Sequence, residues 1–234
     1  MKLYSDLAVW WPLLSPPHHY VEEAADMLRV LEPFEGATLL ELGAGGGSLA
    51  FHLKPHFRLT LTDVSPAMLD QNRMVNPECE FAQGDMRTID LGRQFDRVLV
   101  HDAIMYAADE ASVKATIRNA VRHCCPGGLV VLVPDYVRET FEPGTEQGGE
   151  DGADGRALRY LEWSWDPDPN DSTYQVAYSY MMREADGLVH FDSEIHVEGL
   201  FARHQWLAWA EEAGLTASTR LDEWGRDAII GRKR

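Results

Sequence analysis

The sequence feature that most constrains the fold is a glycine-rich turn between two apolar segments. Residues 38–42 form a mostly apolar run, and four of the five positions from Gly43 to Gly47 are glycine. An apolar pattern that suits a helix resumes at 49–53. Glycines let the backbone adopt positive φ angles and let a ligand approach the main chain beside the unpaired N–H groups of the new helix. We therefore predict a strand, a tight turn that holds a nucleotide-like ligand, and a helix. The alternative is that these glycines only pack a helix onto a strand.

Two acidic residues follow at the ends of predicted strands. The segment 57–62 predicts a second strand, and Asp63 comes directly after it, twenty residues beyond Gly43. An acid at this place can accept hydrogen bonds from both hydroxyls of a ribose. A third predicted strand, 79–82, is followed by Asp85, which is placed to accept the exocyclic amine of adenine, while Met86 could cover the ring. This pattern fits a dinucleotide-dependent oxidoreductase or a methyltransferase that uses S-adenosylmethionine (SAM).

The later motifs separate these two classes. The dinucleotide pattern G-x-G-x-x-G requires glycine at position 48, where this chain has Ser48. Phe95-Asp96 opens a predicted fourth strand, and Pro126-Gly127-Gly128 precedes an apolar run at 129–133. The order and spacing of five motifs resemble those of the class I SAM-dependent methyltransferase family. The motifs are the run from Glu41 to Gly47, Asp63, Gly84-Asp85, Phe95-Asp96 and Pro126-Gly127-Gly128. The resemblance covers residues 38–134 closely.

The resemblance implies where SAM would bind. The glycine turn would admit the methionine end of SAM, Asp63 the ribose hydroxyls, and Asp85 with Met86 the adenine. Glu41 stands where the family more commonly has aspartate, and we expect the extra methylene to be tolerated. The SAM-binding residues predicted in this way are Tyr4, Glu41, Gly43, Ala44, Gly45, Asp63, Val64, Met68, Gly84, Asp85, Met86 and His101.

Two histidines are candidates for catalysis. His101 ends the fourth strand, and its ordinary pKa of about 6.5 would let it act as a general base. Alternatively, His101 only orients the amino acid end of SAM or Asp102. His196, in the segment after the core, is a second candidate base. Transfer from a sulfonium needs in-line placement first, and a base only when the nucleophile arrives protonated.

The alternation of elements predicts an α/β fold. Predicted strands at 38–42, 57–62, 79–82, 95–101 and 129–134 alternate with helices at 47–54, 66–73 and 110–123. We expect a Rossmann-like, doubly wound, seven-stranded sheet that is mostly parallel, with the last strand antiparallel, and an inserted antiparallel β meander. The expected parts are an N-terminal cap segment and helix (1–36), the SAM-binding core (37–135), a loop and β insertion that covers the substrate (136–200), and a C-terminal helix and hairpin (201–234).

The insertion begins with a run rich in glycine and acids at 141–155, which we expect to be a mobile loop. Three extended segments follow, at 156–165, 172–183 and 188–197, and Asp186-Gly187 is a strong hairpin signal between the last two. In the third segment His190, Asp192, Glu194, His196 and Glu198 share one face. That polar face could bind a polar or cationic substrate, form the wet side of a sheet, or lie in a homodimer interface.

Composition limits the partners. The formal charge of −17 argues against binding to nucleic acid or anionic membranes. The position of the insertion resembles the substrate-covering sheet of small-molecule methyltransferases, including the sugar-amine N-methyltransferases and glycine N-methyltransferase. This resemblance implies a small-molecule acceptor that is methylated at N or O. Three cysteines without metal-ligand spacing suggest reduced thiols, and no metal is implied. His18 and His19 are adjacent, would point apart in a helix, and are expected to be exposed rather than metal ligands.

No signal peptide or long apolar segment is recognised, so we expect a cytoplasmic protein. A non-catalytic SAM-binding protein and a protein methyltransferase are the alternatives.

Overall fold

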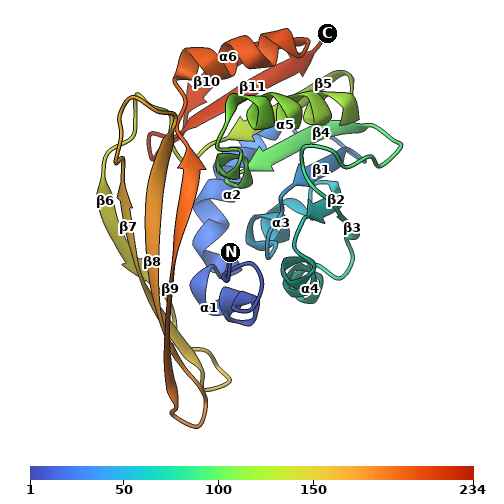
Figure 1. Cartoon of the computed structure of the whole chain (residues 1–234). Helices are drawn as coiled ribbons and strands as arrows, with labels where there is room; N and C mark the ends of the chain where they lie inside the picture. Colours follow the sequence, from blue (N-terminus) through green and yellow to red (C-terminus); the bar gives the residue numbers. More distant parts are fainter.

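A seven-stranded sheet forms the centre of the computed structural model, which describes residues 1–234 (Figure 1). Its spatial order is β10-β11-β5-β4-β1-β2-β3. The strands are β1 (Thr38–Leu42), β2 (Arg58–Asp63), β3 (Glu80–Gln83), β4 (Phe95–His101), β5 (Cys124–Val133), β10 (Leu215–Leu221) and β11 (Asp227–Lys233). Only β11, the last strand, runs antiparallel to its neighbours. The predicted fold class is confirmed, and the strand order reverses between β1 and β4, where ligands bind in such sheets.

Helices cover both faces of this sheet. One face packs against α5 (Glu110–His123) and α6 (Arg203–Glu212), whose buried residues include Ile117, Trp206 and Trp209. The other face packs against α2 (Val21–Leu31) and α3 (Ser48–Leu53), and α4 (Pro66–Val75) follows β2. The Ser65 hydroxyl accepts a hydrogen bond from the Met68 N–H at 3.1 Å and caps α4. None of the helices combines the length and the hydropathy that crossing a membrane requires.

The insertion is a four-stranded antiparallel sheet that stands beside the core (Figure 1). Its strands are β6 (Gly144–Gly148), β7 (Ala157–Trp165), β8 (Thr173–Arg183) and β9 (Val189–Gly199). The prediction of a mobile loop at 141–155 is therefore wrong in part, because this segment contains the edge strand β6. An edge strand needs only backbone pairing, here to β7, so a run without aliphatic side chains can form it. The hairpin turn at Gly187, with φ of 92°, is confirmed.

The two faces of the inserted sheet differ from the usual pattern of apolar inside and polar outside. Along β8, Tyr174, Val176, Tyr180 and Met182 are buried against the body of the protein, and on β9 His196 and Glu198 are buried with them. The alternative that the polar face is the solvent-exposed side of the sheet is thus wrong for His196 and Glu198. The opposite face exposes large apolar side chains, namely Leu161, Trp163, Met181, Val189, Phe191, Ile195 and Val197. We call these residues the outer face.

The N-terminal segment lies between the two sheets (Figure 1). It contains the short helices η1 (Ala8–Trp10), α1 (Trp11–Leu14) and η2 (Pro17–Tyr20). Leu3, Trp10 and Leu13 pack against Leu158, Tyr180 and Met182 of the inserted sheet. The prediction that His18 and His19 are exposed is confirmed, but the prediction that they point apart is wrong. Both imidazole rings turn toward Glu150, which the insertion places outside η2.

Candidate active site

A cavity of about 420 Å³ opens at the carboxyl ends of β1, β2 and β4, which is within the usual range for a ligand site. The predicted SAM-binding residues line it with one exception. Met68 is fully buried and lies behind the turn, with its methyl group 3.7 Å from where a Cβ on Gly45 would be. Met68 therefore supports the turn instead of touching a ligand. Glu41, Asp63 and Asp85 all line this cavity, which agrees with the prediction that the strand ends bring these acids together.

The glycine turn is shaped by contacts on both sides. The Gly45 N–H donates to Asp63 Oδ2 at 2.9 Å, and the Ser65 N–H donates to Asp63 Oδ1 at 2.8 Å. Burial raises the pKa of Asp63 in spite of these bonds. A Cβ on Gly46 would lie 2.1 Å from the indole ring of Trp11, so only glycine lets the N-terminal segment close over the turn. Asp63 thus holds the turn and also faces the cavity.

Asp85 carries a partner that the sequence interpretation did not include. Its carboxylate accepts bonds from the Arg87 side chain, at 2.9 Å from Nε and 2.5 Å from Nη2. The Arg87 guanidinium lowers the pKa of Asp85, and both residues line the cavity. Asp85 is therefore ionised and oriented before any ligand arrives.

Glu41 is the least compensated charge in the cavity. Its side chain is buried, and its Oε2 atom has no hydrogen-bond partner. Burial raises the pKa of Glu41 to about 7. An unpaired buried carboxylate beside a glycine turn is suited to receive a cationic group, which would replace the lost hydration.

His101 belongs to a buried charge network. Its Nε2 lies 2.8 Å from Glu23 Oε1, and its Nδ1 lies 3.1 Å from Asp102 Oδ1. Burial alone would lower the pKa of His101, but Asp102 and Glu23 outweigh it and raise that pKa well above its ordinary value. Arg226, from the β10–β11 hairpin, pairs with Glu23 and lies 3.8 Å from Asp102. Because both ring nitrogens face carboxylates, this geometry favours the orienting role for His101 over that of a general base.

His196 lies behind the cavity wall. Its Nδ1 is 2.9 Å from the Tyr106 hydroxyl, which is 2.7 Å from the Tyr4 hydroxyl, and both tyrosines line the cavity. Burial lowers the pKa of His196, so the imidazole is neutral at neutral pH. His196 does not line the cavity itself, and any effect it has on a ligand passes through Tyr106.

Three acids line the other end of the cavity; Asp102 and Asp135 were not predicted as site residues, whereas Glu198 belongs to the polar face that was predicted as one possible substrate surface. Asp102 follows β4, Asp135 follows β5, and Glu198 comes from β9 of the insertion. Burial alone would raise the pKa of Asp102, but His101 and Arg226 lower that pKa to about 2. Burial raises the pKa of Asp135 and of Glu198. The rule that ligands bind at strand ends could have identified Asp135, but Glu198 needed the position of the insertion.

Aromatic side chains form much of the rest of the cavity wall. Trp11 and Tyr20 come from the N-terminal segment, Tyr106 from η3 (Ala103–Tyr106), and Tyr178 from β8. A cavity with one glycine-lined end and one acidic, aromatic end can hold a nucleoside-like ligand and a cationic one together.

Comparisons with known proteins agree with this geometry. The family model described as methyltransferase domain matches residues 39–128. A dTDP-3-amino-3,6-dideoxy-alpha-D-glucopyranose N,N-dimethyltransferase of Streptomyces fradiae is 29% identical over 202 residues, which are 84% of this chain and 78% of that protein. A Streptomyces venezuelae dTDP-3-amino-3,4,6-trideoxy-alpha-D-glucopyranose N,N-dimethyltransferase is also 29% identical and aligns with 84% of this chain and 83% of that protein.

A solved structure extends the likeness to the whole chain. The sugar N-methyltransferase KedS8 from a Streptoalloteichus species is 30% identical, with a TM-score of 0.81, and the alignment covers 92% of this chain and 88% of that one. The amino pentose methyltransferase CalS10 of Micromonospora echinaspora, solved with SAM bound, is 25% identical with a TM-score of 0.76 over 92% of both chains. The likeness therefore includes the inserted sheet as well as the core.

Proposed function

This chain belongs to the SAM-dependent methyltransferase family, and we propose that its acceptor is the amino group of a small, sugar-like molecule. The enzyme transfers a methyl group from SAM to a small-molecule acceptor. The names of the relatives suggest an amino sugar carried on a nucleotide. The observation that carries the choice of an amine is the group of acids Asp102, Asp135 and Glu198 at the inner end of the cavity.

The cavity suggests one orientation for SAM. Its methionine end would lie against the turn at Gly43 to Gly45, with its ammonium group near the unpaired carboxyl of Glu41. The ribose hydroxyls would bind Asp63. The adenine would lie near Val64 and Met86, with its amine toward Asp85. This orientation directs the sulfonium methyl toward the acidic end of the cavity.

The acidic end suits an amine for two reasons. An ammonium group loses its hydration when it enters the cavity. The negative charge of the Asp102 and Glu198 carboxylates would compensate for that loss. The aromatic walls at Tyr106 and Tyr178 add favourable contacts with a cation. A hydroxyl acceptor would gain little from this charge, so the same groups select against it.

Methylation of an amine requires the removal of a proton. The nitrogen lone pair attacks the methyl carbon, the carbon–sulfur bond breaks, and its electrons stay on sulfur to give S-adenosylhomocysteine. An amine that arrives as ammonium must first lose a proton. Glu198 is suited to accept it, because burial raises its pKa toward that of the amine. The Tyr106–His196 pair offers a second route for a proton.

The test is a methyl-transfer assay with matched acceptors. We would incubate the enzyme and SAM with a dTDP-3-amino-3,6-dideoxyglucose and with the same nucleotide sugar carrying a hydroxyl at that carbon, and follow the product mass. We expect methylation of the amine only. Methylation of the hydroxyl compound but not of the amine would overturn the proposal. The absence of turnover with either compound while SAM is bound would reject this nucleotide-linked amino sugar as the acceptor.

Substitution of Glu198 tests the role of the acids. We expect Glu198→Gln to lower kcat/KM by about 100-fold, which is the scale of general base catalysis, and to leave SAM affinity within a factor of about two. Glu184→Gln, at an exposed acid beyond the end of β8, is the control and should have no effect. An unchanged kcat/KM in Glu198→Gln would remove this residue from the mechanism. The homodimer and the cytoplasmic location stay predictions.

A further inference from the structure

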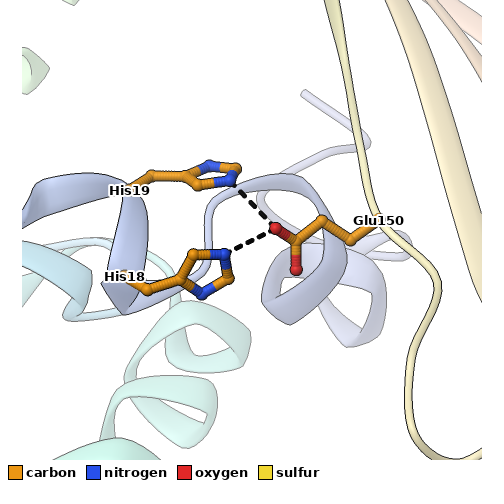
Figure 2. A group of neighbouring side chains, drawn as sticks. All are labelled: His18, His19 and Glu150. Carbon is orange, nitrogen blue, oxygen red and sulfur yellow. Dashed lines mark hydrogen bonds and ion pairs between the residues drawn. The ribbon is translucent and has the colours of Figure 1, made fainter.

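Outside the cavity, two histidines and one glutamate form a compact cluster (Figure 2). His18 and His19 are consecutive residues of η2, and Glu150 lies between β6 and β7 of the insertion. Nε2 of His18 is 2.6 Å from Glu150 Oε1, and Nε2 of His19 is 3.0 Å from the same oxygen. Two rings from one turn thus converge on a carboxylate that is more than 130 residues away in the chain.

The arrangement of the rings matches that of two ligands on one metal ion. A zinc ion lies about 2.0–2.1 Å from an imidazole nitrogen, which places it about 3.1 Å from the ring centroid and puts the centroids of two tetrahedral ligands about 5 Å apart. The centroids of His18 and His19 are 4.6 Å apart, and their planes cross at 73°. The rings therefore need almost no rearrangement.

The third ligand needs only a small shift. Donor atoms on a tetrahedral zinc ion are about 3.3 Å apart, so the Glu150 oxygen would withdraw from both nitrogens by less than about 1 Å. Its side chain is 31% exposed and free to make that movement, and the His18 and His19 side chains are 63% and 47% exposed. Solvent therefore offers both an entry path for an ion and a water for the open coordination position.

We propose that His18, His19 and Glu150 bind one divalent transition-metal ion, with zinc as the expected ion. Two imidazoles and one carboxylate suit zinc better than the oxygen-seeking magnesium and calcium ions. This proposal goes beyond the methyltransferase activity and does not depend on it.

The backbones that carry the ligands are held in place without a metal. The Glu150 N–H donates to the Leu13 carbonyl at 3.1 Å, and the Leu158 N–H donates to the Glu150 carbonyl at 2.9 Å. On the other side, His52 Nε2 donates to the Pro17 carbonyl at 2.7 Å. Because these backbones are already fixed, metal binding costs less conformational entropy.

The position of the cluster indicates a structural role for the ion. It joins the N-terminal segment, which contributes Tyr4, Trp11 and Tyr20 to the cavity wall, to the inserted sheet. A metal that binds only the folded arrangement stabilises the contact between these two parts. The ion would therefore hold the cover of the cavity in place and would not take part in methyl transfer.

Calorimetric titration with zinc chloride is the direct test. The full chain, without a histidine tag and freed of metal by a chelator, is titrated at mildly alkaline pH, where imidazole is neutral. We expect one ion per chain. His18→Ala, His19→Ala and Glu150→Gln should each weaken the affinity by about tenfold or more, the usual scale for lost metal-site contacts. His190→Ala is the matched control, because His190 is an exposed histidine 3.8 Å from Glu184 and should not change the affinity.

Thermal unfolding gives an independent readout. Without zinc, the variants and the wild type should unfold at the same temperature, which shows that the substitutions do not disturb the fold. At one fixed zinc concentration, zinc should raise the unfolding temperature of the wild type and of His190→Ala clearly more than that of the three cluster variants. The absence of saturable binding, or zinc binding that survives in both His19→Ala and Glu150→Gln, would overturn the proposal and leave only a hydrogen-bonded cluster.

Discussion

At Glu41 the needs of stability and of binding oppose each other. The folded protein holds the pKa of Glu41 at about 7, above its ordinary value of 4.5. As pH rises from 4.5 to 7, the unfolded chain releases this proton while the folded protein keeps it, so stability falls across that window and stays reduced above it. The cost at pH 8 is about 1–3 kcal/mol.

Glu41→Gln should therefore raise the free energy of unfolding of the SAM-free protein at pH 8 by about 1–3 kcal/mol, with little gain at pH 4.5. The same change should weaken SAM binding at pH 8, because an amide cannot pair with the ammonium group. Urea unfolding at the two pH values, with calorimetry of SAM binding, would check both effects. An equal gain in stability at both pH values would contradict the assignment of this pKa.

Gly46 tests the closure of the N-terminal segment. In Gly46→Ala the new methyl group would collide with the Trp11 ring, which must then move away from the turn. We expect SAM affinity to fall at least about tenfold, because Trp11 lines the cavity. Gly144→Ala is the control, since its nearest neighbour would be 3.8 Å away and its φ is not positive. Equal affinities for the two variants would show that Trp11 adapts without cost.

At the scale of the elements, the backbone of the first residues of the chain is fastened to β9 by the carboxylate of Glu194. Glu194 accepts hydrogen bonds from the backbone N–H groups of Lys2, at 2.7 Å, and Leu3, at 2.8 Å. Glu194→Ala should increase amide exchange over residues 1–14 and weaken SAM binding, because Leu3, which precedes the cavity residue Tyr4, loses its anchor on β9. Asp192→Ala removes an exposed pair with the Lys2 side chain and a bond from the Ser193 N–H, leaves both backbone bonds to Glu194 in place, and should change neither property. Unchanged exchange in Glu194→Ala would contradict this role.

At the scale of the whole molecule, the outer face gathers seven exposed large apolar side chains on a chain of net charge −17. Contiguous apolar surfaces of this kind commonly lie in interfaces, and we expect the predicted homodimer to form there. Phe191→Lys with Ile195→Lys should shift the mass measured by light scattering to that of a monomer. Leu221→Lys, at an exposed apolar residue on β10, should leave the mass unchanged. A wild-type mass equal to one chain would refute the dimer.

The alternation of strands and helices, the glycine turn and most residues of the cavity lining could be predicted because they depend on local features. Apolar periodicity reports burial, glycines report backbone conformation, and strands that run in parallel bring their carboxyl ends to one edge. These rules placed Glu41, Asp63 and Asp85 together without coordinates. They failed for β6, whose pairing uses only backbone groups, and for Met68, which supports the turn from behind.

The acceptor end of the cavity and the histidine cluster could not be predicted, because each joins side chains from segments far apart in the chain. Glu198 meets Asp102 and Asp135 only after the inserted sheet has packed against the core. In the same way, Glu150 reaches His18 and His19 through a chain path of more than 130 residues. No periodicity or spacing links such residues. Their distances follow from how the two sheets and the N-terminal segment pack, and packing depends on the shape of the whole core.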